Sequence, residues 1–190
     1  TASWFVLSGR VPPGWPDDTY AQFIGRIRSH QCKVLLDASG KALAEGLRAG
    51  PHALKPNEKE LSELLGRPLT TPAEIVAAVR ELLSTHPSVE CVAVSMGGDG
   101  ALFFSQAESL HAQALQVELI STVGAGDAMV AGLVAGKLEG LSLADCARLA
   151  TAFSAGKLSR LGPHLPEPET VRALAASVLL APVGEHVALA

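Results

Sequence analysis

Stretches typical of strands and stretches typical of helices alternate along almost the whole 190-residue chain. Short apolar runs bounded by turn residues predict strands, and apolar residues that recur three and four positions apart predict helices. Such alternation is typical of βαβ units, in which strands pair in parallel and helices pack on the sheet. We therefore expect an α/β fold with a mainly parallel sheet and helices on both faces.

The expected strands cover residues 4–8, 33–37, 53–55, 89–95, 101–104 and 115–118. The expected helices cover residues 17–30, 41–49, 58–65, 72–84, 127–138, 143–158 and 168–179. Thr71 and Glu74 have the spacing of a capping box around Pro72, which predicts a sharp helix start there. The first of these runs is typical of a buried strand and has no helix before it. This predicts a domain whose N-terminal part is absent.

Composition excludes several classes of protein. Hydrophobic residues make up 48% of the chain and charged residues 18%, which favours a compact core over disorder. The net charge of −4 is spread without a basic block, and no apolar run reaches the roughly 20 residues of a membrane helix. The three cysteines are widely spaced, and no basic region of a signal peptide opens the chain. We expect a cytoplasmic protein that binds neither nucleic acid nor membrane.

The turn Gly124-Ala125-Gly126-Asp127 joins a strand-like segment to a helix. Backbone N–H groups at a helix start converge on one point, and glycines let an anion approach them closely. Asp127 would stand in the first helical turn, beside that anion. Phosphoryl transfer needs such donors together with a carboxylate that accepts a proton. A plain glycine turn, with Asp127 only stabilising the helix start, fits these four residues equally well.

A second glycine-rich segment follows the strand expected at residues 89–95. It consists of Ser95, Met96, Gly97, Gly98, Asp99 and Gly100. It has neither the Lys-Ser/Thr pair of a Walker A loop nor the glycine spacing of a dinucleotide fingerprint. It can seat a nucleotide through its backbone. Taken in isolation, an ordinary tight turn between strands is the better interpretation.

A third motif is Lys55-Pro56-Asn57-Glu58-Lys59-Glu60. Asn57 and Glu60 have the spacing of a helix capping box, which is the structural interpretation. Amide and carboxylate oxygens also suit Mg²⁺ or its water ligands, and Lys55 can reach a phosphate. Both interpretations hold together, because a helix start is where anions and their metal ions gather.

Taken in order, the three motifs resemble those of the ribokinase-like carbohydrate kinases of the PfkB family. The matches are Lys55-Pro56-Asn57-x-x-Glu60, Ser95-x-Gly97-x-x-Gly100 and Thr122-Val123-Gly124-Ala125-Gly126-Asp127-Ala128-Met129. The last motif is highly specific for the family, and the resemblance covers essentially the whole chain. It implies a ribokinase-like fold, ATP as phosphoryl donor, Mg²⁺ as cofactor and a sugar hydroxyl as acceptor.

The resemblance also implies roles for individual residues. Asp127 would accept the proton of the attacking hydroxyl, and Gly124, Ala125 and Gly126 would form the anion hole. Residues 95–100 and Lys55 would bind the nucleotide, while Asn57 and Glu60 would organise Mg²⁺ through water. Some family members bind a monovalent cation beside the catalytic turn, where the carbonyls of Ser121 and Val123 would contribute.

Within the family, Lys55-Pro56-Asn57 and residues 6–14 are most similar to the branch that phosphorylates sugar phosphates. Its acceptors include fructose 1-phosphate, tagatose 6-phosphate and fructose 6-phosphate, and residues 121–130 are most similar to the fructose 1-phosphate kinases. Ser8 belongs to the acceptor side of the motif. Arg10 stands where these enzymes usually have a second serine, so either it contacts a substrate phosphate or it is a solvated loop residue.

Family members are usually about half as long again, and their N-terminal part supplies sugar-binding strands and a β-sheet lid. We therefore expect residues 1–190 to form the ATP-binding and catalytic part of the domain, without those strands and that lid. The branch often dimerises through the lid, so a homodimer is expected of the full-length enzyme. Two other functions stay open: a non-catalytic nucleotide-binding module, and a kinase for an unphosphorylated sugar or nucleoside.

Overall fold

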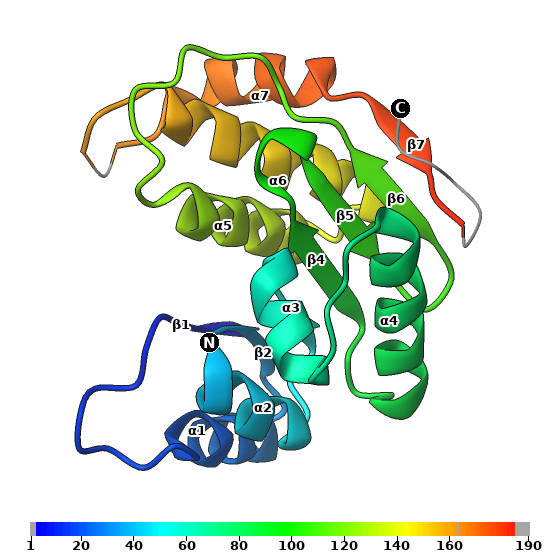
Figure 1. Cartoon of the computed structure of the whole chain (residues 1–190). Helices are drawn as coiled ribbons and strands as arrows, with labels where there is room; N and C mark the ends of the chain where they lie inside the picture. The colour runs from blue at the N-terminus through cyan, green and yellow to red at the C-terminus, as the bar shows by residue number, and fades with distance from the viewer. Residues whose placement is uncertain (1–2, 163, 185–190) are drawn as a thin grey trace. The chain divides into compact units, whose positions relative to one another are not determined.

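A computed structural model describes residues 3–162 and 164–184 of the chain (Figure 1). The described residues divide into two compact units. The first unit lies within residues 1–94, 104–109 and 183–190, and the second within residues 95–103 and 110–182. Each unit is described by itself below.

The first unit is built from strands that alternate with helices. Its elements are β1 (Trp4–Ser8), α1 (Thr19–Ser29), β2 (Lys33–Asp37), α2 (Gly40–Arg48), β3 (Ala53–Leu54), α3 (Glu58–Leu65), α4 (Pro72–Thr85) and β4 (Cys91–Ser95), whose last residue belongs to the second unit. β1, β2, β3 and β4 pair in that order, and each pair is parallel. The parallel α/β arrangement predicted from the sequence is therefore confirmed.

The core of this unit lies on β2, β3 and β4, whose central side chains are buried. β1 differs, because Phe5 and Val6 are 39% and 42% exposed. The expectation of a buried strand at residues 4–8 is therefore wrong. Among the described strands β1 pairs with β2 alone, and a strand with one neighbour is covered less than a central strand. An apolar run by itself cannot distinguish these two positions.

Helix starts in the first unit follow the capping rules. Asn57 and Glu60 form a capping box at α3, and Thr71 and Glu74 form another at α4, where Pro72 is the first helical residue. Both starts were predicted from the sequence. α3 ends at Gly66 in the left-handed conformation, which glycine adopts without strain.

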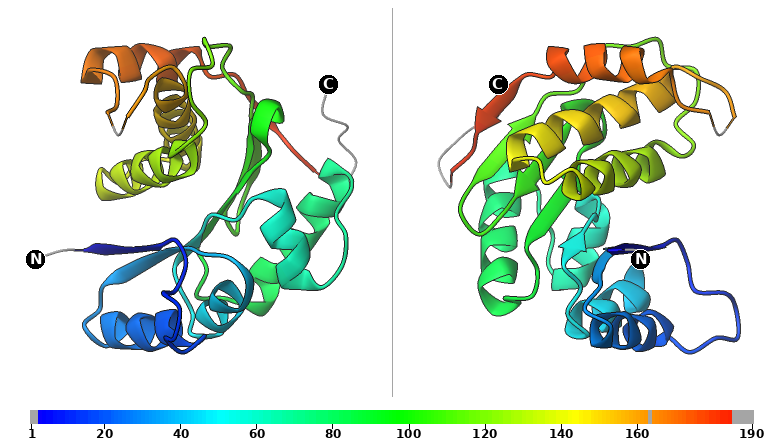
Figure 2. Two further views of the ribbon diagram at one scale, coloured as in Figure 1. Left: turned by 60° about the vertical axis from the view of Figure 1, so that its left-hand side comes forward. Right: turned by 180° about the vertical axis from the view of Figure 1, so that it is seen from behind.

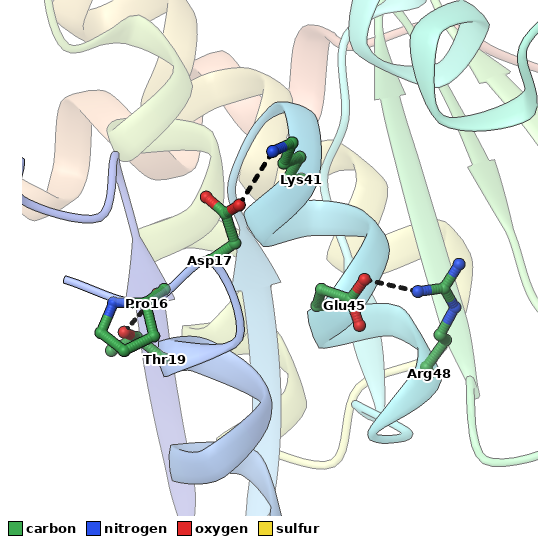
Figure 3. Close-up of polar contacts among 6 residues, drawn as sticks. All are labelled: Pro16, Asp17, Thr19, Lys41, Glu45 and Arg48. Atoms are coloured by element: carbon green, nitrogen blue, oxygen red, sulfur yellow. Dashed lines mark hydrogen bonds and ion pairs between the residues drawn. The ribbon is translucent and has the colours of Figure 1, made fainter. Parts of the chain in front are cut away.

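The loop between β1 and α1 is held by polar contacts that Figure 3 shows. The carboxylate of Asp17 points at the ammonium of Lys41, at the start of α2, across 3.0 Å. Thr19 donates its hydroxyl to the carbonyl of Pro16 at 2.6 Å. Glu45 and Arg48 pair within α2. Both ion pairs are exposed, so each contributes at most about 1 kcal/mol, and of the two only the pair of Asp17 and Lys41 involves the loop.

The elements of the second unit are η1 (Gly97–Asp99), β5 (Ala101–Phe104), β6 (Ser109–Ala112), α5 (Ala125–Leu138), α6 (Leu143–Leu158), α7 (Pro168–Ser177) and β7 (Leu180–Pro182). The last residue of β5 and the first residue of β6 belong to the first unit. Figures 1 and 2 show α5 and α6 side by side. Two glycines of α5 make this close packing possible. A Cβ on Gly132 would lie 2.8 Å from Cα of Ala150, and one on Gly136 would lie 2.8 Å from Sγ of Cys146. The glycines are therefore packing residues of the helix pair.

The strand predicted at residues 115–118 is absent, and the structure has irregular backbone there. The strand in this region is β6, which pairs in antiparallel fashion with β7, an unpredicted strand near the C-terminus. His111 faces Ala181 in this ladder. The alternating residues Leu115 to Glu118 have the period of a strand, but their apolar side chains line a cavity instead. No helix among the described residues is long and apolar enough to span a membrane.

The glycines of helices α1 and α5 provide a test of this packing. Gly132→Ala should lower the free energy of unfolding by about 1–3 kcal/mol, because its methyl group would overlap the backbone of α6. Gly25→Ala, in α1, is the control: its Cβ meets nothing within 4 Å, and alanine favours a helix over glycine by about 1 kcal/mol. Chemical denaturation of both variants measures the difference. Equal effects would contradict the packing role of Gly132.

Candidate active site

The catalytic motif of the sequence lies at the start of α5. Gly124 is the N-cap residue, with φ 81° and ψ 5°, a left-handed conformation that glycine adopts readily. Ala125 donates its N–H to the carbonyl of Thr122 at 3.3 Å, which closes the turn. α5 begins two residues earlier than predicted, so Ala125, Gly126 and Asp127 all lie in its first turn. The N-terminal end of a helix attracts anions, and this turn therefore has the properties of an anion hole.

A cavity of about 460 Å³ lies within the second unit, beside this turn. Ala125 and Gly126 line one side of it. The other predicted residues that line it come from the nucleotide loop, namely Ser95, Gly97, Gly98 and Gly100. Two motifs separated by more than twenty residues in the sequence therefore meet at one cavity. Its volume is in the range of pockets that hold a small molecule.

Glycine is required at the end of the nucleotide loop. Gly100 has φ 88°, and a Cβ there would lie 2.1 Å from the carbonyl oxygen of Ala112. The loop is a single 3-10 turn, and the carbonyl of Gly100 accepts the N–H of Met96 at 2.9 Å. His111 donates from Nε2 to the carbonyl of Asp99 at 2.6 Å, which fixes the tautomer. Neither Met96, which is buried, nor Asp99 lines the cavity.

Most residues of the remaining cavity wall were missed by the sequence analysis. Apart from Gln116 they are apolar or small, and they comprise Ala114, Leu115, Gln116, Val117, Leu119, Thr122, Met129, Ser154 and Leu158. Residues 113–119 have no regular secondary structure, yet half-buried Leu115 is among the residues that line the cavity. The sequence signal was available, since an apolar run just ahead of a catalytic turn can form a binding surface as well as a strand.

A polar cluster of the first unit lies at the carboxyl ends of its first three strands. Lys55 follows β3 and pairs with Asp37, the last residue of β2, at 3.1 Å. Ser8, the last residue of β1, donates its hydroxyl to Asp37 at 3.0 Å. The side chains of Lys55 and Asp37 are 6% and 14% exposed. The lysine predicted to reach ATP phosphate thus has a buried carboxylate as partner, which the sequence analysis missed.

Tyr20 belongs to the same cluster. Its hydroxyl donates to the carbonyl of Ser8 at 2.9 Å. Burial and, secondarily, the negative charge of Asp37 raise the pKa of Tyr20 above its ordinary value. The phenol therefore stays protonated and continues to donate. Arg10, predicted on the acceptor side, lies nearby in the sequence, on the loop after β1, and is exposed.

Asn57 and Glu60 hold each other at the start of α3. Asn57 accepts the N–H of Glu60 through Oδ1 at 2.9 Å, and Glu60 accepts the N–H of Asn57 through Oε2 at 2.9 Å. The structural interpretation of this motif is therefore present in the molecule. Glu60 has a second carboxylate oxygen, and Mg²⁺ commonly keeps several waters and binds through one or two carboxylates. Within residues 3–162 and 164–184 no group of three His, Cys, Asp or Glu residues could hold a metal ion.

The structure thus places the predicted residues in two groups. Ser95, Gly97, Gly98, Gly100, Ala125 and Gly126 share the cavity of the second unit, with Gly124 and Asp127 adjacent in the turn. Ser8, Arg10, Lys55, Asn57 and Glu60 belong to the first unit. A cavity between a glycine-rich loop and a helix start that carries an aspartate is typical of a kinase site.

Comparison with known proteins agrees with this class. The model of the pfkB family carbohydrate kinases matches residues 1–170. The 1-phosphofructokinase of Rhodobacter capsulatus is 46% identical over 175 residues, which are 92% of this chain and 55% of that protein. The enzyme of the same name from Escherichia coli K12 is 34% identical over 176 residues, 93% of this chain and 56% of that protein. The chain belongs to the PfkB family.

Solved structures show the same fold. Phosphofructokinase-2 from Escherichia coli in complex with potassium has a TM-score of 0.86 at 30% identity, covering 92% of this chain and 57% of that one. Arabidopsis thaliana ribokinase, complexed with ribose and ATP, has a TM-score of 0.77 at 28% identity, covering 92% and 56%. The predicted ribokinase-like fold is confirmed. The chain spans about half the length of the curated relatives it matches.

The buried pair of Lys55 and Asp37 leads to a stability prediction. Asp37→Asn would leave a buried ammonium without its counter-charge, so it should lower the free energy of unfolding by about 3 kcal/mol. Asp17→Asn breaks an aspartate–lysine pair whose side chains are 61% and 82% exposed, and should cost less than about 0.5 kcal/mol. Urea denaturation compares the two. A loss at Asp37 no larger than at Asp17 would refute the electrostatic role of the buried pair.

Proposed function

We propose that this chain carries the ATP-binding and phosphoryl-transfer part of a sugar-phosphate kinase. The acceptor that we propose is fructose 1-phosphate, and the product is fructose 1,6-bisphosphate. The observation that carries the proposal is the cavity in the second unit. There the glycine loop and the first turn of α5 converge, next to Asp127. The relatives named 1-phosphofructokinase, 34–46% identical, support the choice of acceptor.

ATP fits the two kinds of wall that the cavity offers. Leu115, Val117 and Leu119 provide apolar side chains on which a base can rest. Gly97 and Gly98 leave the backbone of the loop open to the ligand, because no Cβ stands in the way. The start of α5 would then face the phosphates, as the helix dipole favours. The neighbouring ribokinase structure contains ATP, which supports this assignment.

Phosphoryl transfer in this site would depend on the first turn of α5. Backbone N–H groups of residues 124–126 would stabilise the charge that builds on the moving phosphoryl group. Asp127 would accept the proton of the attacking hydroxyl. A carboxylate is a weak base for an alcohol. In a loose transition state this suffices, because the proton leaves late.

The first unit would supply the metal and acceptor contacts. Glu60, with Asn57, would orient Mg²⁺ through water, and the metal would neutralise phosphate charge. Lys55 would bind a phosphate of ATP. Ser8 and Arg10 would contact the sugar phosphate, since guanidinium groups bind phosphate bidentately. A monovalent cation near the carbonyls of Ser121 and Val123 is a further proposal, supported by the potassium complex of the neighbour.

Three alternatives have the same donor site and differ at the acceptor. Tagatose 6-phosphate or fructose 6-phosphate would replace fructose 1-phosphate without any change at the cavity. A non-catalytic nucleotide-binding module would bind ATP and transfer nothing.

We propose a cytoplasmic enzyme that binds neither membrane nor nucleic acid and that forms a homodimer in its full-length state. A panel of sugar phosphates, sugars and nucleosides, assayed with the full gene product, separates these alternatives.

Asp127→Asn tests the proposed base. Turnover with fructose 1-phosphate should fall by about 10²- to 10⁴-fold, because general-base catalysis contributes that much, while ATP affinity should change little. Asp145→Asn, in the first turn of α6, is the matched control, since it removes an acidic residue from a neighbouring helix start. If both variants lose only thermal stability and keep their turnover, Asp127 is a helix-stabilising residue and the proposed base is wrong.

Gly98→Trp tests the nucleotide cavity. Gly98 lines the cavity, has no positive φ, and a Cβ there meets nothing within 4 Å, so the indole can enter without backbone strain. ATP affinity, measured by calorimetry, should fall at least about tenfold, which corresponds to 1.4 kcal/mol. Gly184→Trp has equally open surroundings and lies outside the cavity, so it should bind ATP normally. Undiminished ATP binding by Gly98→Trp would place the nucleotide elsewhere.

A further inference from the structure

Lys157 is a buried cation in the last turn of α6. It is 6% exposed, and its Nζ donates to the carbonyl oxygen of Arg160 at 3.2 Å. Lysine is among the residues that are almost never fully buried unless paired, because water solvates the ammonium better than the interior does. A buried lysine of this kind needs an explanation in the structure around it.

The side chain of Lys157 packs against the catalytic turn. A Cβ placed on Gly124 would lie 3.4 Å from Cε of Lys157. Gly124 is the left-handed residue from which α5 begins. The last methylene of the lysine, which carries the ammonium, therefore lies beside the backbone that forms the anion hole.

The neighbouring residue holds the segment that leads into the same turn. The carbonyl of Leu158 accepts the N–H of Ile120 at 2.8 Å and the N–H of Ser121 at 3.1 Å. Lys157 and Leu158 thus contact residues 120–124 at both ends. The last turn of α6 therefore contacts both ends of the segment of residues 120–124, which leads into α5.

A simpler explanation is that Lys157 compensates the negative end of the α6 dipole. That interaction operates at a solvated helix end and does not require burial. Lys137 occupies the corresponding last turn of α5 and is only half-buried. The helix dipole therefore accounts for a lysine at this position, but it leaves the burial against Gly124 unexplained.

We propose that Lys157 is a positioning residue for phosphoryl transfer. It supplies a fixed positive charge next to the Gly124 turn. The inference rests on the proposed function. The charge acts on the negative charge that develops on the transferred phosphoryl group. Removal from water reduces the screening of this charge, and its fixed position means that no reorganisation is needed during the reaction.

The test separates the charge of Lys157 from its hydrogen bond. Lys157→Gln removes the positive charge and retains an N–H donor, on a side chain one atom shorter, that can be directed at the carbonyl of Arg160. In the full gene product, kcat with ATP and fructose 1-phosphate should fall about 10- to 100-fold, a range below the 10²–10³ seen when an anion-hole donor is removed. KM for the sugar phosphate should change by less than about threefold, because the charge acts on the transition state. Lys137→Gln, the matched control, should keep normal kcat.

Chemical rescue identifies the missing charge directly. Lys157→Ala leaves room for a small organic cation, so ethylammonium at constant K⁺ should raise its kcat at least about fivefold, with tetramethylammonium chloride at equal ionic strength as the control. The same salts should leave the kcat of Lys137→Ala unchanged. A variant that lost activity through misfolding alone would show a lowered melting temperature and no rescue, and that outcome would overturn the proposal.

Assays of the wild-type protein distinguish a failure of the Lys157 proposal from a failure of the proposed function. Normal kcat in Lys157→Gln, beside an active wild type, would refute the role of Lys157 and leave the proposed function intact. A wild type that binds ATP but transfers phosphate to no member of the acceptor panel would refute the proposed function, and the inference with it. Loss of kcat in Lys157→Gln together with rescue of Lys157→Ala would support both.

Discussion

The left-handed turn at Gly124 is the constraint on which the second unit depends. With φ 81° this residue reverses the chain between an irregular segment and α5, so that three further residues enter the first helical turn. A side chain there would be strained by the backbone conformation and would press on Lys157. α5 in turn packs on α6 through its own glycines, and α6 ends in the residues that bracket the turn. The conformation of the Gly124 turn and the packing of α5 on α6 therefore depend on each other.

The first unit concentrates its polar groups by the geometry of parallel strands. Carboxyl ends of neighbouring parallel strands meet at one edge, and Ser8, Asp37 and Lys55 follow that rule on β1, β2 and β3. The register pairs Ser8 with Asp37, which brings the hydroxyl within 3.0 Å of the carboxylate. Burying a charged pair costs solvation energy, and its geometry must compensate for that loss. Such a pair is retained more readily at a functional edge than in a core, because a hydrophobic substitute would pack equally well.

Local patterns predicted most of the fold. The capping boxes placed α3 and α4, and the bounds of α6 were predicted to the residue, because these signals depend only on nearby side chains. The strand predicted at residues 115–118 is wrong because period-two alternation indicates one apolar face, and such a face can belong to a strand or can line a cavity. β6, β7 and the exposure of β1 depend on which segments pair across the chain. At the site, the loop and turn were predicted from their glycines, whereas Asp37, Met129 and Lys157 required the three-dimensional contacts.

A nucleotide donor and a sugar acceptor are recognised by different kinds of chemical group. The cavity of the second unit is lined by glycines and apolar side chains, and such a surface suits the proposed nucleotide without contacting the sugar that would receive the phosphate. Discrimination between acceptors needs polar side chains placed against individual hydroxyl and phosphate groups, because an unmatched buried polar group is costly. Under the proposed function such side chains would be Ser8 and Arg10, of the first unit. Under the proposed function, a substitution at Arg10 would therefore alter the choice of acceptor while the cavity of the second unit stays the same.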